Sequence, residues 1–344
     1  MAGLLWKGMT MAVVGCAGIL VADTFCGPMP RLPKAGELLA VEHLKSSPGG
    51  CAANVAICLA RQGLCVDVAG CVGRDASADA LLQELKSGRV GCDQVVRCAD
   101  WPTSRTVILL VENEDRRYIH EFGANRAFTT RLIDRNWLNG LKLFYFGGLF
   151  ATPGIAIDEF AELLTYCRRR GIVTVVDVVV PQSFECREQL SHILPHIDFF
   201  LPNSDEACRL TGESDVQHQL NALLAWGART VVVTGGTNGC TASDGHRIWN
   251  CGTFAMRSTD PSGAGDAFAA GVITGALRGW EMDATLKYAT ALGGSATLSL
   301  GTTTSVFDAK QADEFVNLHS LPVCCVPLAD ASSSTNRATK GVFT

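Results

Sequence analysis

The residues best suited to chemistry lie in the glycine-rich segment DPSGAGD at 260–266, which leads into the small-residue stretch AFAAGVITGALRGW. This pattern predicts a closely packed helix whose first backbone N–H groups are free to bind an anion, assisted by the helix dipole. Asp266 in the first turn would repel that anion. A carboxylate beside a phosphate site is what a proton-accepting base for phosphoryl transfer needs. The spacing alone leaves open that Asp266 only stabilises the helix start.

A second glycine-rich segment, GGCAAN at 49–54, runs into the stretch VAICLARQG. Its apolar residues predict a helix that ends at Gly63, a natural C-terminal stop. Asn54 is a polar residue in an otherwise apolar helix start. Its amide could bond the hydroxyls of a ligand, or it could cap backbone groups.

The elements that must position these segments alternate between short apolar strands and helices. This order predicts a mostly parallel sheet with helices on both faces, an α/β fold. A first strand is expected at Met11–Val14, followed by a turn at Gly15–Gly18. The later strands are expected at Leu143–Phe146, Val173–Val176, Phe199–Leu201 and Thr230–Thr234, and the helices near Ile155–Arg170, at Ser204–Thr211 and at Asp215–Trp226.

Three segments do not follow this alternation and predict a small β-sheet appendage. Strand-like stretches occur at Glu37–Leu44, Ser104–Val111 and Arg116–Phe122, and the last two flank a turn at 112–115. Because the pieces are separated in sequence, the appendage is expected to be an insertion on the main domain. The Ser/Thr-rich tail from Asp330 is expected to be flexible.

Composition excludes several classes of protein. The 344 residues are 47% hydrophobic and carry a net charge of −5, which argues against disorder and against nucleic-acid binding. The apolar segment Met9–Ala22 resembles a signal peptide, but a buried strand is the preferred interpretation, and no transmembrane helix is expected. The 15 cysteines include no Cys-x-x-Cys pair, and the count is odd. These features favour a reducing, cytoplasmic location over disulfides or zinc.

Taken in order, four segments resemble the ribokinase-like (PfkB-type) carbohydrate kinases. They are GGCAAN at 49–54, NSDE at 203–206, TGGTNG at 234–239 and GAGD at 263–266. A P-loop signature is absent, as expected for a family with a different anion cradle. The resemblance implies a single ribokinase-like kinase domain over residues 1–344, with a β-sheet lid formed by about 24–48 and 102–122 and a tail at 330–344.

The resemblance also implies catalytic roles. Asp266 would take the proton from the acceptor hydroxyl, and the backbone of Gly263, Ala264, Gly265 and Asp266 would hold the transferring phosphoryl group. The nucleotide is implied to be ATP with Mg²⁺. The residues that would serve it are Asn203 with Glu206, which holds Mg²⁺ through water, and Thr234, Gly235, Gly236 and Gly239, which line ATP.

On the acceptor side the resemblance implies a sugar site formed by Asp23, Gly49, Gly50 and Asn54. The lid would cover this site and form the contact of a homodimer. Two departures argue against ribose as the acceptor. Gly147-Gly148 stands where ribose-specific members carry a glutamate, and Cys51 stands where ribokinases often carry a lysine. A third departure, Pro261, changes the loop before Gly263.

A potassium ion is a further implication of the resemblance. Asp260, Ser262, Gly301 and Ser305, with carbonyls near Ala296, resemble the loop that binds a monovalent cation in the family. Two other functions remain open. One is a nucleoside kinase, which shares the fold and motifs. The other is a non-catalytic protein that senses sugars or nucleotides.

Overall fold

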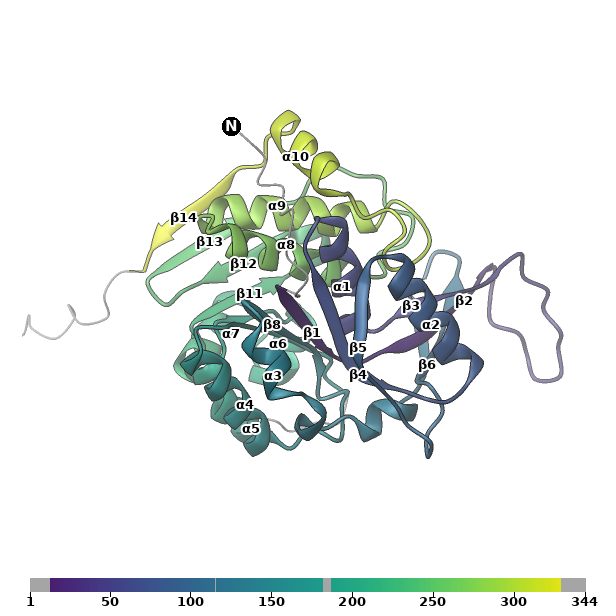
Figure 1. Ribbon diagram of the computed structural model, residues 1–344. Helices are drawn as coiled ribbons and strands as arrows, with labels where there is room; N and C mark the ends of the chain where they lie inside the picture. Colours follow the sequence, from purple (N-terminus) through teal and green to yellow (C-terminus); the bar gives the residue numbers. More distant parts are fainter. Residues whose placement is uncertain (1–12, 115, 182–186, 329–344) are drawn as a thin grey trace, which may run out of the picture.

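The computed structural model describes residues 13–114, 116–181 and 187–328, and a ten-stranded sheet forms its centre (Figure 1). In spatial order the strands are β14 (Val323–Pro327), β13 (Arg247–Cys251), β12 (Cys240–Ser243), β11 (Thr230–Thr234), β10 (Phe199–Phe200), β9 (Val173–Val178), β8 (Leu143–Leu149), β1 (Val14–Gly18), β4 (Val66–Val72) and β5 (Val90–Arg97). The strands from β11 to β5 are parallel to their neighbours, and β12, β13 and β14 are antiparallel. The predicted mostly parallel sheet is confirmed.

Helices cover both faces of this sheet and bury an apolar core on each side. One core contains residues of α1 (Cys51–Arg61), α2 (Ala76–Ser87), α8 (Ala264–Arg278), α9 (Met282–Ala296) and α10 (Ala309–Leu318). The other contains residues of α3 (Arg135–Asn139), α4 (Ile157–Arg169), α5 (Arg187–Ile193), α6 (Ser204–Thr211) and α7 (Val216–Ala225). Two buried layers explain why the central strands are apolar on both sides.

A separate four-stranded sheet, called the small sheet from here on, packs at one side of the molecule (Figure 1). Its spatial order is β3 (Leu44–Gly49), β2 (Val21–Met29), β6 (Arg105–Val111) and β7 (Arg117–Glu121). Strand β2 continues almost directly from β1. The connection is held by Asn125, whose side chain bonds both the N–H and the carbonyl of Leu20. The core of the protein and the small sheet are thereby fixed together.

Two sequence predictions of local structure are wrong. Gly15–Gly18 belongs to β1 rather than to a turn, because it pairs with β4 and β8 on either side. A Cβ on Gly15 would lie 2.4 Å from Leu141, so this glycine serves close packing. The stretch 37–43 is not a strand, and β3 begins only at Leu44. The pairing of β3 with β2 ends near Gly27, because Pro28 of β2 has no N–H to continue the hydrogen bonds between the two strands. Met11 and the tail at 330–344 lie outside the described residues.

Candidate functional site

The start of α8 lies at the edge of the sheet where the parallel strands end. Gly263 is its N-cap residue, in the left-handed conformation with a φ of 76°. A Cβ on this residue would lie 2.0 Å from the carbonyl oxygen of Thr302. Ala264 and Gly265 follow as the first residues of the helix, and the space around the Gly265 Cα is open. The predicted helix start with an accessible backbone is therefore present.

Asp266, in the first turn of α8, is joined to the other glycine-rich segment. Asn54 Nδ2 donates a hydrogen bond of 2.8 Å to Asp266 Oδ2. Thr302 Oγ1 donates to Asn54 Oδ1 at 2.9 Å, so the Asn54 amide is fixed with its nitrogen toward the carboxylate. Of the two roles considered for Asn54, backbone capping is not the one seen, because its polar atoms orient Asp266.

A cluster of acidic groups surrounds Asp266. The Sγ of Cys51 and carboxylate oxygens of Asp177 and Asp266 all lie within 4.8 Å of one another. Tyr145 donates its hydroxyl to Asp177 Oδ2 at 3.2 Å. Burial raises the pKa of Asp266, against hydrogen bonds from Asn54 and Cys51 that lower it. Burial also raises the pKa of Asp177, and the charges of Asp266 and Glu206 raise it further. A carboxylate with a raised pKa is a stronger proton acceptor.

Sequence reasoning missed Asp177 and Tyr145. Asp177 is the first charged residue after the apolar run of β9, near the carboxyl end of that strand. Ligands in parallel sheets bind at the carboxyl ends of the strands, so this position was a signal that could have been used. Tyr145 gave no signal, because an apolar strand residue and a site residue look alike in a sequence.

On the other side of Asp266, the small sheet presents a polar row. Ser47, Asp23, Thr106 and His120 pair in register across β3, β2, β6 and β7, which places their side chains on one face. Thr106 Oγ1 and His120 Nδ1 are 3.0 Å apart. A Cβ on Gly49 would lie 1.8 Å from Asp23 Oδ2, so only glycine leaves room for this carboxylate. Asp23 was predicted as a site residue, and the other members of the row were not.

The charge of Asp266 acts on Asp23. Burial raises the pKa of Asp23 to about 7, a hydrogen bond from Thr106 lowers it, and the charge of Asp266 raises it. Gly50 is the N-cap residue of α1, with a φ of 86°, and Asn54 lies about one turn along that helix. The structure therefore brings the predicted residues Asp23, Gly49, Gly50 and Asn54 to one place beside Asp266.

The pKa of Asp23 predicts a specific dependence of stability on pH. Because the folded protein binds this proton up to about pH 7, and the unfolded chain releases it near 3.8, stability falls as pH rises through that window. In D23N the side chain cannot ionise, so we expect a smaller fall in Tm between about pH 5 and about pH 8 than in the wild type. Thermal unfolding at both pH values tests this. An equal fall in both proteins would contradict it, and D283N, at an exposed position, is the control.

The predicted nucleotide residues also come together. Asn203 caps α6, its side chain accepts from the Glu206 N–H, and Glu206 accepts in return from the Asn203 N–H. Asn203, beyond the end of β10, forms an isolated parallel bridge with Thr234 at the end of β11. Burial raises the pKa of Glu206 to about 7, and the charges of Asp266 and Asp205 raise it further, against a backbone hydrogen bond from Asn203 and the charge of Arg209 that lower it. The capping box by itself would account for both residues, and their service to a nucleotide remains a prediction.

The loop after Thr234 is a tight turn. Gly235 N–H donates to the Gly239 carbonyl at 2.7 Å. Gly236 and Gly239 have φ values of 57° and 84°, which favour glycine. A Cβ on Gly239 would lie 2.0 Å from the carbonyl oxygen of Cys251. Gly236 and Gly239 are therefore required by the backbone, whether or not a ligand binds, whereas Gly235 has an ordinary φ of −118°.

Comparison with known proteins shows the family. Residues 15–309, most of the chain, match the profile described as pfkB family carbohydrate kinase. The chain belongs to the pfkB family of carbohydrate kinases. A fructoselysine 6-kinase of Shigella flexneri is 31% identical over 253 residues, covering 72% of this chain and 87% of that protein.

Solved structures show that this pfkB-family kinase has the ribokinase fold. Arabidopsis thaliana ribokinase, solved with ribose and ATP, gives a TM-score of 0.77 at 22% identity, covering 88% of this chain and 98% of its own. A putative ribokinase II from E. coli, in complex with ATP and Mg²⁺, gives 0.76 at 19% identity, covering 90% and 100%. The predicted fold class is confirmed. Within the described residues, no helix of this kinase has the length and apolar character to cross a membrane.

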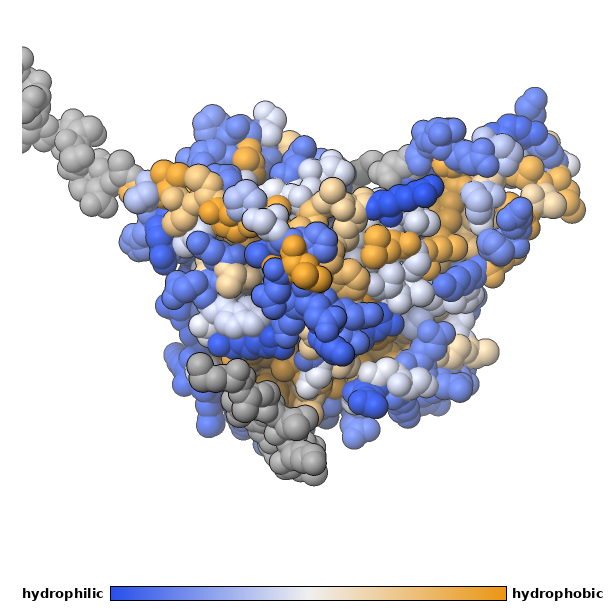
Figure 2. Space-filling view, turned by 90° about the horizontal axis from the view of Figure 1, so that it is seen from above, coloured by the Kyte–Doolittle hydropathy of each residue, from blue (hydrophilic) through white to orange (hydrophobic). Residues whose placement is uncertain are grey.

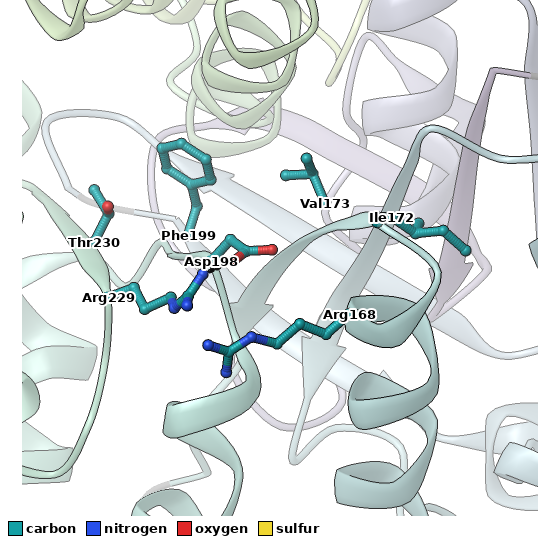
Figure 3. Close-up of a pocket in the computed structure, with 8 residues that line it drawn as sticks. Arg168, Ile172, Val173, Asp198, Phe199, Arg229 and Thr230 are labelled. Atoms are coloured by element: carbon teal, nitrogen blue, oxygen red, sulfur yellow. Dashed lines mark hydrogen bonds and ion pairs between the residues drawn. The ribbon is translucent and has the colours of Figure 1, made fainter.

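An open pocket at the opposite edge of the sheet does not belong to this site (Figure 3). It lies where β9, β10 and β11 begin, and Asp198, Arg229 and Arg168 line it. Arg229 Nη1 bonds Asp198 Oδ1 at 3.0 Å, and Arg168 donates to the Pro195 carbonyl. These three charged side chains are therefore already paired with other groups of the kinase.

Proposed function

We propose that this kinase transfers the γ-phosphoryl group of ATP to a hydroxyl of a small sugar or sugar-like molecule. One observation carries the proposal. Asp266 lies partly buried in the first turn of α8, three residues after the left-handed Gly263, and is bonded to Asn54 of the neighbouring glycine-rich segment. A proton acceptor and a set of backbone donors thus occupy one place, as transfer between an alcohol and a phosphate requires.

In the proposed reaction Asp266 accepts the proton of the acceptor hydroxyl. The freed oxygen forms a bond to the γ-phosphorus, the bond from that phosphorus to the β–γ bridging oxygen breaks, and ADP leaves with the electron pair. The N–H groups from Gly263 to Asp266 would hold the charge on the transferring group, and Asn54 orients the base. Positioning and electrostatics carry most of the catalysis in such transfers.

The residues present fit Mg²⁺ and ATP. Asp177 offers a carboxylate oxygen within 4.8 Å of one of Asp266, and the charge of Glu206 acts on Asp177. Mg²⁺ prefers oxygen ligands and retained waters. We propose that Glu206 holds Mg²⁺ through water, and the ion would neutralise charge on the nucleotide phosphates. For ATP, the proposed lining is Asn203, Thr234, Gly235, Gly236 and Gly239, where the backbone turns leave little side-chain bulk.

For the acceptor, the proposed site combines Asp23, Gly49, Gly50 and Asn54, with the polar row of the small sheet beside them. Ser47 Oγ in that row is buried and has no hydrogen-bond partner within the described residues. Carboxylate, hydroxyl and imidazole groups in one row offer both donors and acceptors, which suits a molecule with neighbouring hydroxyls. The small sheet would cover this molecule as a lid and exclude water.

The experiment that tests the function measures ADP formation with a panel of pentoses, hexoses, sugar acids and nucleosides. Turnover with a sugar supports the proposal, and turnover with nucleosides alone favours a nucleoside kinase. Binding of ATP and sugar without any turnover, in folded protein, would favour a sensing protein and overturn the proposal. Core cysteines such as Cys16, Cys58 and Cys71 are buried thiols, which suits the proposed cytoplasmic location.

We propose that the small sheet also forms a homodimer contact. Its outward face exposes Leu44 and Ile119 by 69% and 63%, and Ile119 pairs in register with Val107. Figure 2 shows hydrophobic side chains gathered at this side of the molecule. Exposed apolar residues that cluster in this way mark interaction surfaces.

If this face joins two copies, Ile119→Lys should convert a dimer to a monomer, because it buries a charge in an apolar contact. Light scattering coupled to size-exclusion chromatography measures the change. Leu318→Lys is the matched control, since Leu318 is 80% exposed on α10, away from the small sheet. A monomeric wild-type protein, or a dimeric Ile119→Lys variant, would contradict the proposal.

A further inference from the structure

A cationic side chain of the small sheet reaches the loop that leads into α8. Arg116 lies just before β7, and its Nη1 donates to Ser262 Oγ at 3.0 Å. The same nitrogen is 3.9 Å from Asp260 Oδ1. The Arg116 side chain is 20% exposed and that of Asp260 is 2% exposed, so the contact is largely shielded from water.

Asp260 needs a positive neighbour because of where it lies. It stands three residues before Gly263, beside the proposed phosphoryl site. Ser262 donates to Asp260 Oδ1 through its N–H at 3.0 Å and its hydroxyl at 2.7 Å, and Gly301 N–H donates to Oδ2 at 3.1 Å. These donors are neutral. They solvate the carboxylate but leave its charge, which would repel an incoming phosphate in a poorly hydrated site.

The potassium ion implied by the family resemblance does not fit this arrangement. Potassium is held by oxygen atoms, yet both Asp260 oxygens face N–H or O–H donors, and the Arg116 guanidinium stands at one of them. The Ala296 carbonyl, which the resemblance also implies as a ligand, already accepts a hydrogen bond from the Ser305 hydroxyl at 3.1 Å. Two cations at one buried carboxylate would repel each other.

We propose that Arg116 supplies the positive charge at Asp260 that a monovalent cation would otherwise supply, so that this kinase works without potassium. The inference rests on the proposed phosphoryl transfer. Arg116 acts as a positioning residue. Its hydrogen bond to Ser262 stabilises the conformation of the loop before Gly263, and its charge neutralises that of the Asp260 carboxylate. Arg116 does not touch the reacting atoms.

The test measures ADP formation in potassium, sodium and tetramethylammonium chloride at equal ionic strength. The wild type should turn over equally in all three. R116A should lose about 100-fold in kcat without potassium, the cost of leaving a buried charge unpaired. Potassium, but not sodium, should raise the kcat of R116A by at least about tenfold. R116K keeps a positive charge and should be active without potassium.

Lys45 provides a matched control. Its Nζ donates to the Leu300 carbonyl at 3.2 Å, so it is a second cation from the small sheet that contacts the same region without reaching Asp260. K45A should behave as the wild type in all three salts. Loss of activity in K45A equal to that in R116A would show a general lid effect and overturn the proposal.

A second readout does not depend on turnover. Potassium should raise the Tm of R116A, or of R116Q if R116A does not fold, and should leave the wild-type Tm unchanged relative to sodium. Potassium activation of the wild type, or full activity of R116A without potassium, would overturn the inference. Failure of the wild type to phosphorylate any acceptor would instead count against the proposed function, and the Tm comparison would still decide the role of Arg116.

Discussion

Replacing Asp266 by asparagine is expected to lower kcat by about 10³-fold while the affinity for ATP changes little. Asparagine keeps the size of the side chain and an oxygen that can accept from Asn54, so the geometry of the site should survive. What is lost is the group that accepts the proton. Initial rates at saturating acceptor, together with calorimetric titration of ATP, measure the two quantities.

The raised pKa of Asp266 predicts how kcat/KM depends on pH. Burial raises the pKa of Asp266, and only its ionised form can accept a proton. Wild-type kcat/KM should therefore fall as pH falls through that raised pKa, and D266N should lack this limb. D283N is the matched control, because Asp283 lies in the first turn of α9 and is exposed. Retention of about a tenth of wild-type kcat in D266N would remove Asp266 from the role of base.

Gly263→Ala is expected to be the second most damaging change. Alanine would have to adopt a φ of 76°, and its Cβ would meet the Thr302 carbonyl oxygen at 2.0 Å. Thr302 also bonds Asn54, which orients Asp266, so its displacement would disturb the base as well as the backbone donors. We expect a loss of about 100-fold or more in kcat/KM, measured with the best acceptor of the panel.

Gly279→Ala separates the effect of a positive φ from the effect of the clash with Thr302. Gly279 ends the same helix with a φ of 65°, but no atom lies within 4 Å of the Cβ it would gain. This variant should lose about 1 kcal/mol of stability from backbone strain and keep its activity. Equal kinetic loss in both variants would mean that the effect comes from α8 as a whole. Full activity of Gly263→Ala would contradict the proposed phosphoryl site.

The sequence predicted those parts of the fold whose determinants are local. Ser204–Thr211 was expected as a helix and is observed with those bounds, because Asn203 and Glu206 form a capping box within four residues. Strand β11 was likewise expected at Thr230–Thr234. Where the determinant is a distant partner, prediction failed. Gly15 looked like part of a turn, but it lies in a strand because it pairs with Asp67 and Phe144, and the close approach of Leu141 explains why it is glycine.

The candidate site divides in the same way. Asp266, Gly263 and the GGCAAN segment could be recognised because glycine and carboxylate spacing along the chain carries the chemistry of a helix start. Asp177 left only a weaker signal, its place near the carboxyl end of an apolar strand. Thr106 and His120 could not be recognised, since each sits in an ordinary strand and joins the polar row only through sheet register.

The sequence by itself determined the family, the parallel α/β fold and the helix start that carries the proposed base, because these depend on residues close together in the chain. Tertiary structure alone decided what faces that base. Asn54 meets Asp266 across 212 positions, and Arg116 meets Ser262 across 146. Glycines such as Gly49 and Gly263 link the sequence to the tertiary structure. A backbone can approach another atom closely only where a Cβ is missing, and the approaching atom belongs to a part of the chain that spacing cannot identify.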